Sequence, residues 1–494
     1  MPVDKKEGTE MKNAKSIWAR FGVASLALAM ALGLVACNNK TADQPSTTEP
    51  TSTEEPTSGG DEELTPNYSG KTYDDSEFKI LMRSDTLYVN EMAIDKLTTT
   101  STELDKKVYY RNKEVERKMG VTLTFITDSQ ANVQSAVKNA FSGNMTDAYD
   151  LVINHGRSIL HGAESGYYVD WNTMPTVNTD APWWSQNIKS AWTTPSGKLY
   201  AANGDISYLS VGVANCMYFN KDLVAALEGA ASPYTYVNEN NWTFETFFQS
   251  ARDVGGTIAS KGGYGYVAQV WRGPVDALYA SGYSTIVINE DRSYRIGIQN
   301  ERSYNTIDAY VAFLKEDCAM LTDDLGKARR LFTDNNLVYF DDNIYAATSA
   351  YKDVNFGILP FPKYSTDVEN YQSLVGSGAD TFAIFALTTD ENRQRIGDVV
   401  ECLAYIGYTD VVPFYFDTLV TKQSTKDPES RQSLTIIRST LVFDLGHYLN
   451  PGSIGDISVK VVSGESGYPS LSTGLEKMVL DGKIAAALAV WLEK

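Results

Sequence analysis

The side chains that carry most catalysis and metal binding are few in this chain of 494 residues, which contains 3 histidines and 4 cysteines. His155 and His161 are six positions apart, outside the spacing that puts two ligands on one helical face, and no HExxH motif occurs. Cys216, Cys318 and Cys402 are far apart and show no CxxC spacing. The sequence therefore predicts no metal site, no cofactor and no disulfide framework, with these three thiols buried.

Two glycine-rich runs resemble catalytic motifs without completing them. Residues 262–265 (GGYG) lack the Lys-Ser/Thr that ends a phosphate-binding loop. Residues 464–467 (GESG) bring the second glycine one place too early for a nucleophile elbow. We therefore expect no catalytic residues and a binding protein rather than an enzyme.

Polar side chains follow two apolar segments that read as strands. Residues 83–85 follow Phe78–Met82, and residues 154–157 follow Leu151–Ile153. The carboxyl ends of parallel strands meet at one edge of a sheet, where ligands of α/β folds bind. The candidate ligand-binding residues at this edge are Asp85, Asn154, His155 and Arg157.

The segments between these positions predict the sheet that would align them. Thr102 to Asp105 form a capping box for a helix that Gly120 ends, and residues 121–125 alternate as the next strand. A second helix covers about 133–141 and leads to the strand at 151–153. Strand, helix, strand, helix and strand with short joints predict a parallel sheet with helices on its faces.

Further elements are expected along the rest of the chain. We predict a strand running into a helix start over 215–223, a strand leaving through a rigid turn over 356–362, and a further strand at 381–387. Helices are expected after Thr243, which serves as N-cap, from about 391 to 407, and around Leu434 and Ile437. No internal repeat is found, and the length allows more than one domain.

The beginning of the chain has the order of a secretory signal. Basic residues precede an uncharged run from Phe21 to Ala36, which at sixteen residues is shorter than the ~20 that span a bilayer. Leu34-Val35-Ala36-Cys37 resembles the lipobox of bacterial lipoproteins, in which the peptide is cut before the cysteine and the thiol is diacylated. We expect 1–36 to be a signal peptide, with Met11 as a possible true start, and Cys37 to be the lipidation site.

Residues 37–69 predict a lipid anchor and a disordered tether, because from Asn38 to about Asn67 the chain is rich in Thr, Ser, Pro, Glu and Gly and has no aromatic residue. The whole chain is acidic, with 62 acidic against 43 basic residues and a formal net charge of −19. This charge argues against nucleic acid and other polyanions as partners, and against charge-driven binding to anionic lipid. We therefore expect a cell-membrane protein held on the extracellular face by its acyl chains.

The order of several segments resembles the extracellular solute-binding proteins of ABC importers, in particular the large carbohydrate-type class related to maltose-binding protein. The matching segments cover most of residues 76–450 and read, in order, KMGVTLTF, YDLVI, GKLYAANGD, MYFNKDL, NWTFETFFQSA, FTDNNLVYF, FGILPFPKYS and DTFAIFALT. A later segment, DPESRQSLTIIRSTLVFDLG, resembles one seen in variants from Gram-positive bacteria. The resemblance implies two α/β lobes, joined by crossing hinge strands, that close on a ligand in the cleft between them.

The resemblance also assigns the lobes and their partners. Lobe 1 would comprise 70–210 and 376–410, and lobe 2 would comprise 211–375 and 411–494. Hinge candidates are Gly212 and the run Gly376-Ser377-Gly378, because glycine tolerates backbone change. The implied partners are a small-molecule ligand, with an oligosaccharide favoured, and the subunits of an ABC permease.

Further site residues follow from the resemblance. Trp271 and Arg272 stand where related proteins present aromatic residues in the cleft, and Phe340 and Asp341 stand where the second lobe faces the ligand. Asp380 follows the suspected crossing and could bind a hydroxyl, a cation or an amine; the family often has an aromatic residue here, which leaves sugar specificity open. Trp183 and Trp184 follow Pro182, and we expect one of the pair to be structural; Trp183 is included among the ligand-binding candidates.

Three functions remain open at this point. The first is a lipid-anchored protein that captures a solute for an importer. The second is a surface glycoside hydrolase, which needs only two carboxylates in a chain with plentiful acids. The third is an adhesin or a sensor that binds a ligand without transport.

Overall fold

The computed structural model describes residues 65–494, apart from 352, 417–419, 421–426, 481–482 and 494. The predicted signal peptide (1–36), Cys37 and the tether up to residue 64 lie outside the described residues. Within the described part, no helix is long and apolar enough to cross a membrane.

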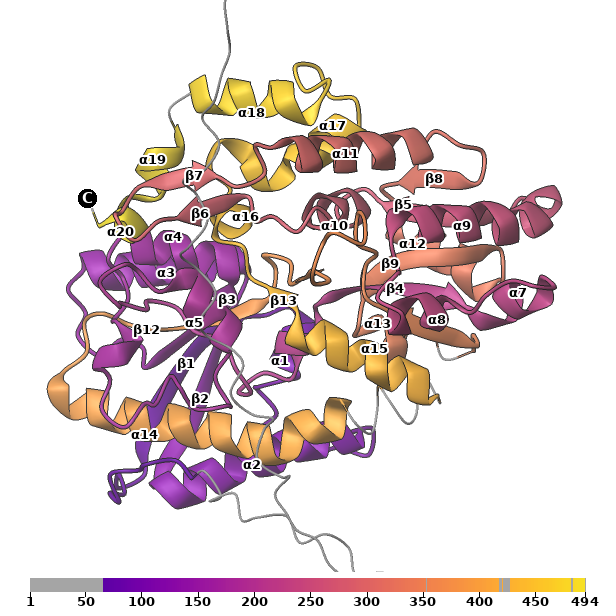
Figure 1. Ribbon diagram of the computed structural model, residues 1–494. Coiled ribbons are helices and arrows are strands. Elements are labelled where there is room, and N and C mark those ends of the chain that lie inside the picture. Colours follow the sequence, from indigo (N-terminus) through magenta and orange to yellow (C-terminus); the bar gives the residue numbers. More distant parts are fainter. Residues whose placement is uncertain (1–64, 352, 417–419, 421–426, 481–482, 494) are drawn as a thin grey trace, which may run out of the picture. The chain divides into compact units, whose positions relative to one another are not determined.

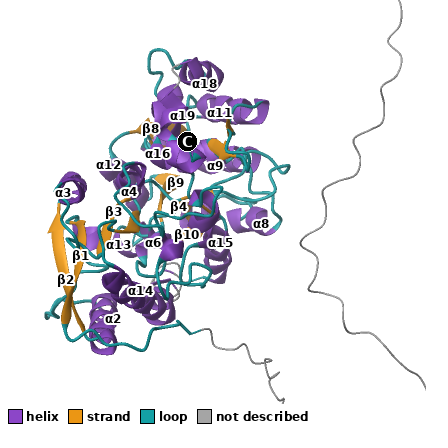
Figure 2. Ribbon diagram, turned by 90° about the vertical axis from the view of Figure 1, so that its left-hand side faces the viewer, coloured by secondary structure: helices purple, strands orange, loops and turns teal. Residues whose placement is uncertain are grey.

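Lobe 1 is built on a four-stranded sheet with the order β12-β3-β1-β2. Strands β1, β2 and β3 are parallel as predicted, and β12 runs antiparallel to β3. The strands are β1 (Ser76–Arg83), β2 (Val121–Asp128), β3 (Leu151–His155) and β12 (Asp380–Ile384). The helices are α1 (Thr86–Val89), α2 (Glu103–Met119), α3 (Gln130–Ser142), α4 (Gly156–Glu164), α5 (Gln186–Trp192) and α14 (Asp390–Ile406). Helices α2 and α14 lie side by side (Figures 1 and 2).

The caps that the sequence predicts in this lobe are present. The Thr102 hydroxyl accepts from the Asp105 amide at 3.1 Å, and the Asp105 carboxylate accepts from the Thr102 amide at 2.7 Å. Gly120 ends α2 with a φ of 62°, a left-handed conformation that favours glycine. These local signals explain why α2 begins and ends where the sequence predicts.

Lobe 2 contains a five-stranded sheet with the order β10-β4-β9-β5-β8. Its strands are β4 (Asn215–Asn220), β5 (Tyr264–Gln269), β8 (Ala319–Thr322), β9 (Leu337–Asn343) and β10 (Phe356–Leu359). A two-stranded hairpin, β6 (Ile286–Ile288) and β7 (Tyr294–Ile296), is separate from it. The helices are α7 (Lys221–Ala226), α8 (Pro233–Asn238), α9 (Phe244–Ile258), α10 (Gly273–Tyr279), α11 (Glu301–Phe313), α12 (Leu325–Thr333) and α13 (Ala346–Ser349). Strands β5 and β9 are parallel, so their carboxyl ends meet at one edge.

Two segments of the chain run between the two sheets. The first crossing includes α6 (Leu209–Gly212), and the second follows β11 (Ser373–Leu374); Ala214 and Val375 form an antiparallel bridge between them. A Cβ on Gly212 would lie 2.8 Å from the Tyr415 hydroxyl, whereas one on Gly376 would meet nothing within 4 Å. Close packing therefore explains glycine at 212 but not at 376.

The C-terminal tail contacts both lobes rather than lobe 2 alone. Helix α15 (Pro428–Ser439) packs against β10 and α8, and α17 (Ile457–Val462) packs against α10. By contrast α16 (Leu445–Leu449) and α20 (Ala489–Leu492) pack against α4 of lobe 1. The tail is completed by β13 (Leu441–Val442), α18 (Leu471–Leu480) and α19 (Lys483–Ala487). The tail thus adds to the connection between the lobes.

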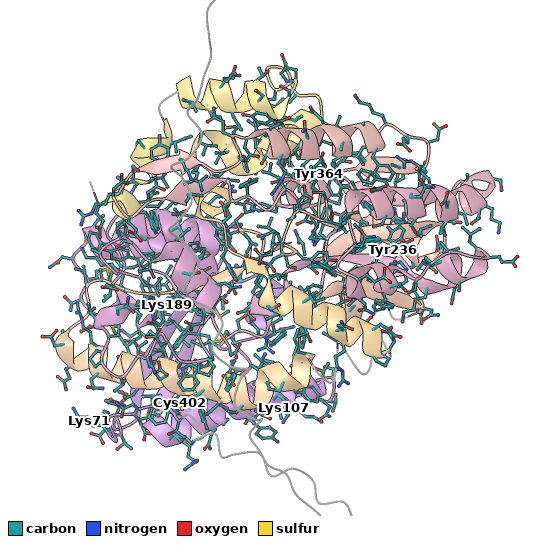
Figure 3. All side chains as sticks on the ribbon, viewed as in Figure 1. Lys71, Lys107, Lys189, Tyr236, Tyr364 and Cys402 are labelled. Atoms are coloured by element: carbon teal, nitrogen blue, oxygen red, sulfur yellow. The ribbon has the colours of Figure 1, made fainter. Side chains whose placement is uncertain are left out.

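Packed structure begins slightly before the predicted boundary at residue 70. Tyr68 is partly buried against the core, and the Ser69 amide donates to Asp398 on α14 at 3.1 Å. On the same helix Cys402 (Figure 3) is buried, as is Cys216, while Cys318 is half-buried. Burial raises the pKa of all three thiols, that of Cys402 to about 11, so they remain protonated.

Candidate functional site: two polar clusters beside the crossing segments

The first polar group, the lobe 1 cluster, comprises Arg83, Tyr88, His155, Arg157 and Asp380 at the carboxyl ends of β1 and β3. The Nε of Arg83 lies 2.6 Å from an Asp380 carboxylate oxygen, and its Nη2 donates to the Gly378 carbonyl at 2.6 Å. The Arg83 guanidinium also lies 3.2 Å from the centre of the Tyr88 ring. Arg83 and Asp380 are both buried, so this ion pair is sealed inside the protein.

Burial governs the acidity of this cluster. It raises the pKa of Asp380 to about 6, although the Arg83 guanidinium acts in the opposite direction. Burial also raises the pKa of the neighbouring Glu91 well above its usual range, with the Asp380 charge as the second cause. Because Asp380 is neutralised by Arg83 and covered, it offers no charge to select a cation or an amine.

Asn154, His155 and Arg157 come together beside this ion pair as the topology predicts. The Arg157 Nε donates to the Tyr448 carbonyl at 3.0 Å and its Nη2 to the His447 carbonyl at 3.3 Å. Burial, with Arg83 and Arg157 nearby, lowers the pKa of His155 to about 4, so the ring is neutral at neutral pH. Asn154 is buried and donates to the Gln130 carbonyl at 3.1 Å, and Asp85 is exposed just after β1.

The second polar group, the lobe 2 cluster, comprises Trp271, Arg272, Arg329, Asp342 and Tyr351. Asp342 is fully buried and binds Arg272 through one oxygen; its other oxygen accepts from Arg329 Nε at 2.8 Å and from the Tyr351 hydroxyl at 2.7 Å. The Arg272 and Arg329 side chains stay 21% and 31% exposed. Sequence reasoning missed Arg329 and Tyr351, which lie on or beside helices and follow no strand of the sheet directly.

Trp271 and its predicted companions in lobe 2 have different surroundings. The Trp271 side chain is 63% exposed, with its amide held by the Gln269 side chain at 2.8 Å. Phe340 and Asp341 on β9 are fully buried. Burial raises the pKa of Asp341 far above its usual range and that of nearby Asp276 to about 7. Trp271 is thus the candidate here whose ring face is open.

Trp183 is part of the core of lobe 1. Its side chain is 1% exposed, and its indole N–H donates to Glu401 at 2.6 Å, while that of Trp184 donates to the same carboxylate at 2.9 Å. The Trp183 ring packs edge-on against Tyr405 with ring centres 5.4 Å apart. Both tryptophans are therefore structural here, where one of the two was expected to be.

The two clusters border the same crossing segments. The Ile344 amide, just beyond β9, donates to the Ala214 carbonyl at 3.0 Å, and Ala214 bridges Val375. From Val375 the chain runs to Gly378, which accepts from Arg83. The Tyr448 hydroxyl donates to the Gly376 carbonyl at 3.1 Å, and the main-chain carbonyl of Tyr448 accepts from Arg157. Main-chain contacts therefore link the two clusters through the hinge.

A large cavity lies apart from all ten predicted ligand-binding residues. It has a volume of about 1040 Å³ and is bordered by α5, the segment 284–290 with strand β6, the segment 370–372 and the segment 439–445. Its lining is rich in amides and hydroxyls, among them Asn187, Gln372 and Thr440. Because its walls come from four distant segments, no local sequence signal could have found it. Among the described residues, no group of three or more His, Cys, Asp or Glu could hold a metal ion.

The fold is a two-lobed α/β fold like that of maltose-binding protein. The chain is similar to the GacH receptor of Streptomyces glaucescens, solved unliganded and with acarbose, at 16% identity and a TM-score of 0.54 over 82% of this chain and 99% of that one. It is also similar to a cyclo/maltodextrin-binding protein solved with maltotetraose (14% identity, TM-score 0.54, 84% and 99% covered). A third similar structure is MalX of Streptococcus pneumoniae with maltopentaose, at 15% identity and a TM-score of 0.52 over 82% of this chain and 100% of that one. No family model and no curated protein matches the chain.

Proposed function

We propose that this chain is a lipid-anchored extracellular solute-binding protein that captures a carbohydrate between its lobes and delivers it to an ABC permease. The observation that carries the proposal is the pairing of an open tryptophan ring, Trp271, with partly exposed arginines beside the crossing segments of a two-lobed fold. Sugar recognition needs such a flat apolar face together with fixed hydrogen-bond donors. The sugar ligands named for the three similar structures support the same class of ligand.

The surroundings of the buried acids argue against a glycoside hydrolase. That reaction needs two carboxyl groups that reach the scissile bond. Asp342 and Asp380 are each held by arginine and covered by protein, and Asp341 is fully buried. At the two clusters, these three carboxylates therefore serve the fold and leave binding as the better supported function.

Ligand binding is tested on the full chain purified in a detergent without a sugar headgroup. Maltotriose and other oligosaccharides are added in a thermal-shift screen, and the ligand is recovered and analysed by chromatography. We expect a higher melting temperature with at least one oligosaccharide and an unchanged ligand. Release of shorter sugars would establish hydrolysis instead, and a panel without any shift would refute carbohydrate capture.

The location of the ligand is tested with two variants. Trp271→Ala removes the open ring of the lobe 2 cluster, while Gln372→Ala truncates a polar wall of the large cavity. We expect Trp271→Ala to weaken oligosaccharide binding by about tenfold or more, because ring stacking is lost, and Gln372→Ala to have little effect. The reverse pattern would move the site to the cavity.

The anchor and the transport role need tests in cells. Cys37→Ser should release the protein from the membrane fraction into the medium, because two acyl chains are needed for stable anchoring. Loss of uptake of a labelled oligosaccharide on deletion of the gene would support import. Normal uptake together with lost transcriptional response to the sugar would favour the sensor alternative, and loss of surface attachment alone would favour an adhesin.

A further inference from the structure

We propose that the carbohydrate is acidic, an oligosaccharide bearing uronate carboxylates that are bound by Arg272 and Arg329 of lobe 2 with Arg157 of lobe 1. This inference rests on the proposed function and names the substrate class of the same site. It follows from the inventory of charged groups that the fold gathers beside the crossing segments.

In lobe 2, two guanidinium groups share one carboxylate. A guanidinium has five N–H donors, and Asp342 takes one nitrogen from each of Arg272 and Arg329. Asp342 itself is saturated, because it also accepts from Tyr351 and from the Asn343 amide at 2.8 Å. Among the described residues, no second carboxylate lies within 4 Å of either arginine. Both side chains are partly exposed and have donors left for a planar, bidentate acceptor such as a carboxylate.

The other acids of lobe 2 do not cancel the remaining positive charge. Asp341 and Asp276 lie below the arginines, and both are fully or almost fully covered. Burial favours their neutral forms, raising the pKa of Asp276 to about 7 and that of Asp341 well above its usual range. The lobe 2 cluster therefore brings two guanidinium groups onto one carboxylate, that of Asp342.

Lobe 1 adds a further cation at the same crossing. Arg157 is half-buried, and its hydrogen bonds go to two main-chain carbonyls, which carry no full charge. In the described chain, no carboxylate lies within 4 Å of it. Arg83 is paired with Asp380, and the nearby acids Asp444 and Asp456 act on His447, whose carbonyl accepts from Arg157.

This local balance opposes the character of the whole chain. With 62 acidic and 43 basic residues, a random set of charged groups would be acidic. Instead, the two clusters contain four arginines from separate segments, Arg83 and Arg157 in lobe 1 and Arg272 and Arg329 in lobe 2. In lobe 2 the open ring of Trp271 directly precedes Arg272 in the chain, so this lobe offers a stacking surface for a sugar ring and N–H donors for its carboxylate.

The test compares three probes by calorimetry on the full chain: trigalacturonate, maltotriose as a neutral trimer, and citrate as a carboxylate without sugar rings. We expect trigalacturonate to bind at least about tenfold tighter than maltotriose, and citrate to bind weakly or not at all. The affinity for trigalacturonate should fall between about 50 mM and about 500 mM salt, while binding of a neutral sugar should not change.

Variants assign the effect to residues. Arg272→Gln and Arg329→Gln should each weaken trigalacturonate binding by about tenfold or more and weaken maltotriose binding by a smaller factor, because a carboxylate loses a charge-assisted hydrogen bond where a hydroxyl loses a weaker one. The matched control is Arg252→Gln, which removes an exposed lobe 2 arginine bound to one carboxylate, Glu316, away from the crossing. Melting temperatures of all variants without ligand identify any that fail to fold. If a variant does not fold, the salt dependence of trigalacturonate binding to the unaltered chain still tests whether the ligand is bound through its charge.

The outcomes separate the two proposals. Tighter binding of maltotriose, equal binding of citrate, or unchanged trigalacturonate affinity in both folded arginine variants would each overturn the acidic-sugar inference while leaving carbohydrate capture intact. Binding of neither sugar would overturn carbohydrate capture, and the present inference with it.

Discussion

The carboxyl ends of the strands are used differently in the two lobes. In lobe 1, Arg83 and Asp380 are buried together, and the groups around them bind each other or the main chain. In lobe 2, Asp342 is equally buried, but it is bound by two arginines that remain partly exposed beside an open tryptophan ring. The same topological position thus holds a sealed ion pair in one lobe and unsatisfied donors in the other.

The difference teaches that a polar residue after a strand is a weak indicator of a ligand site until its partner is known. Asp380 is paired with one buried arginine, whereas Asp342 is bound by two partly exposed arginines that keep further N–H donors. The experiments below test whether the lobes differ in this way.

Two tryptophans give the largest expected contrast. Trp183→Ala in lobe 1 should lower the free energy of unfolding by about 3–5 kcal/mol, because it empties a buried ring site and removes one of the donors to Glu401. Trp271→Ala in lobe 2 should change it by less than about 0.5 kcal/mol, because the ring is mostly exposed. Urea denaturation of both variants measures the difference, and similar losses would contradict the assignment of Trp271 to an open surface.

The two-arginine arrangement of lobe 2 predicts the next largest effect. Asp342→Ala should lower the free energy of unfolding by about 2 kcal/mol, less than a fully buried pair costs, because the freed arginines can be hydrated. The control is Glu316→Gln, which breaks the exposed pair with Arg252 and should cost less than about 1 kcal/mol. Equal effects in chemical denaturation would show that Asp342 does not organise the cluster.

Acid titration tests the buried carboxyls of both lobes. The pKa of Asp276 in the folded chain is about 7 and that of Asp380 about 6, both above the unfolded value of about 3.9. The folded state therefore binds more protons, and this stabilising contribution is complete below about pH 3.9 and lost as the pH rises through 6 to 7. We expect the free energy of unfolding to fall over this range by at most about 1.4 kcal/mol per pH unit for each group.

Asp276→Asn isolates one of these groups. The free energy of unfolding of the variant, relative to that of the unaltered chain, should be greater at about pH 8 than at about pH 5. The reason is that the variant lacks the carboxyl that must ionise while buried. The measurement is urea denaturation at both pH values. An identical difference at the two pH values would exclude a raised pKa for Asp276.

The crossing itself gives the smallest effect. Gly212→Ala places a Cβ 2.8 Å from the Tyr415 hydroxyl and 3.0 Å from Leu209 Cδ2, so we expect a loss of about 1 kcal/mol in the free energy of unfolding. Gly376→Ala meets nothing within 4 Å and should change it by less than about 0.5 kcal/mol. Melting curves of both variants compare the crossings; a larger loss at Gly376 would contradict the close packing assigned to Gly212.

Local chemistry in the sequence determined most of the elements. The capping box at Thr102, the left-handed stop at Gly120 and the alternation after it are short-range signals, and α2 and β2 occur where these signals predict. The parallel order of β1, β2 and β3 followed because short joints and intervening helices permit little else. The sequence also indicated that Asn154, His155 and Arg157 would lie together with Arg83, since strand ends in such a sheet meet at one edge.

Only the tertiary structure decided which of those residues are open and which are satisfied. Trp183 and Trp271 look equivalent as letters, but one is enclosed by Glu401 and Tyr405 and the other faces outward. Asp380 and Asp342 likewise differ in how many arginines reach them and in the other donors that they accept from, and Arg329 comes from a helix with no strand-end signal. Burial and ion pairing depend on contacts between segments far apart in the chain, so spacing along the sequence carries no record of them.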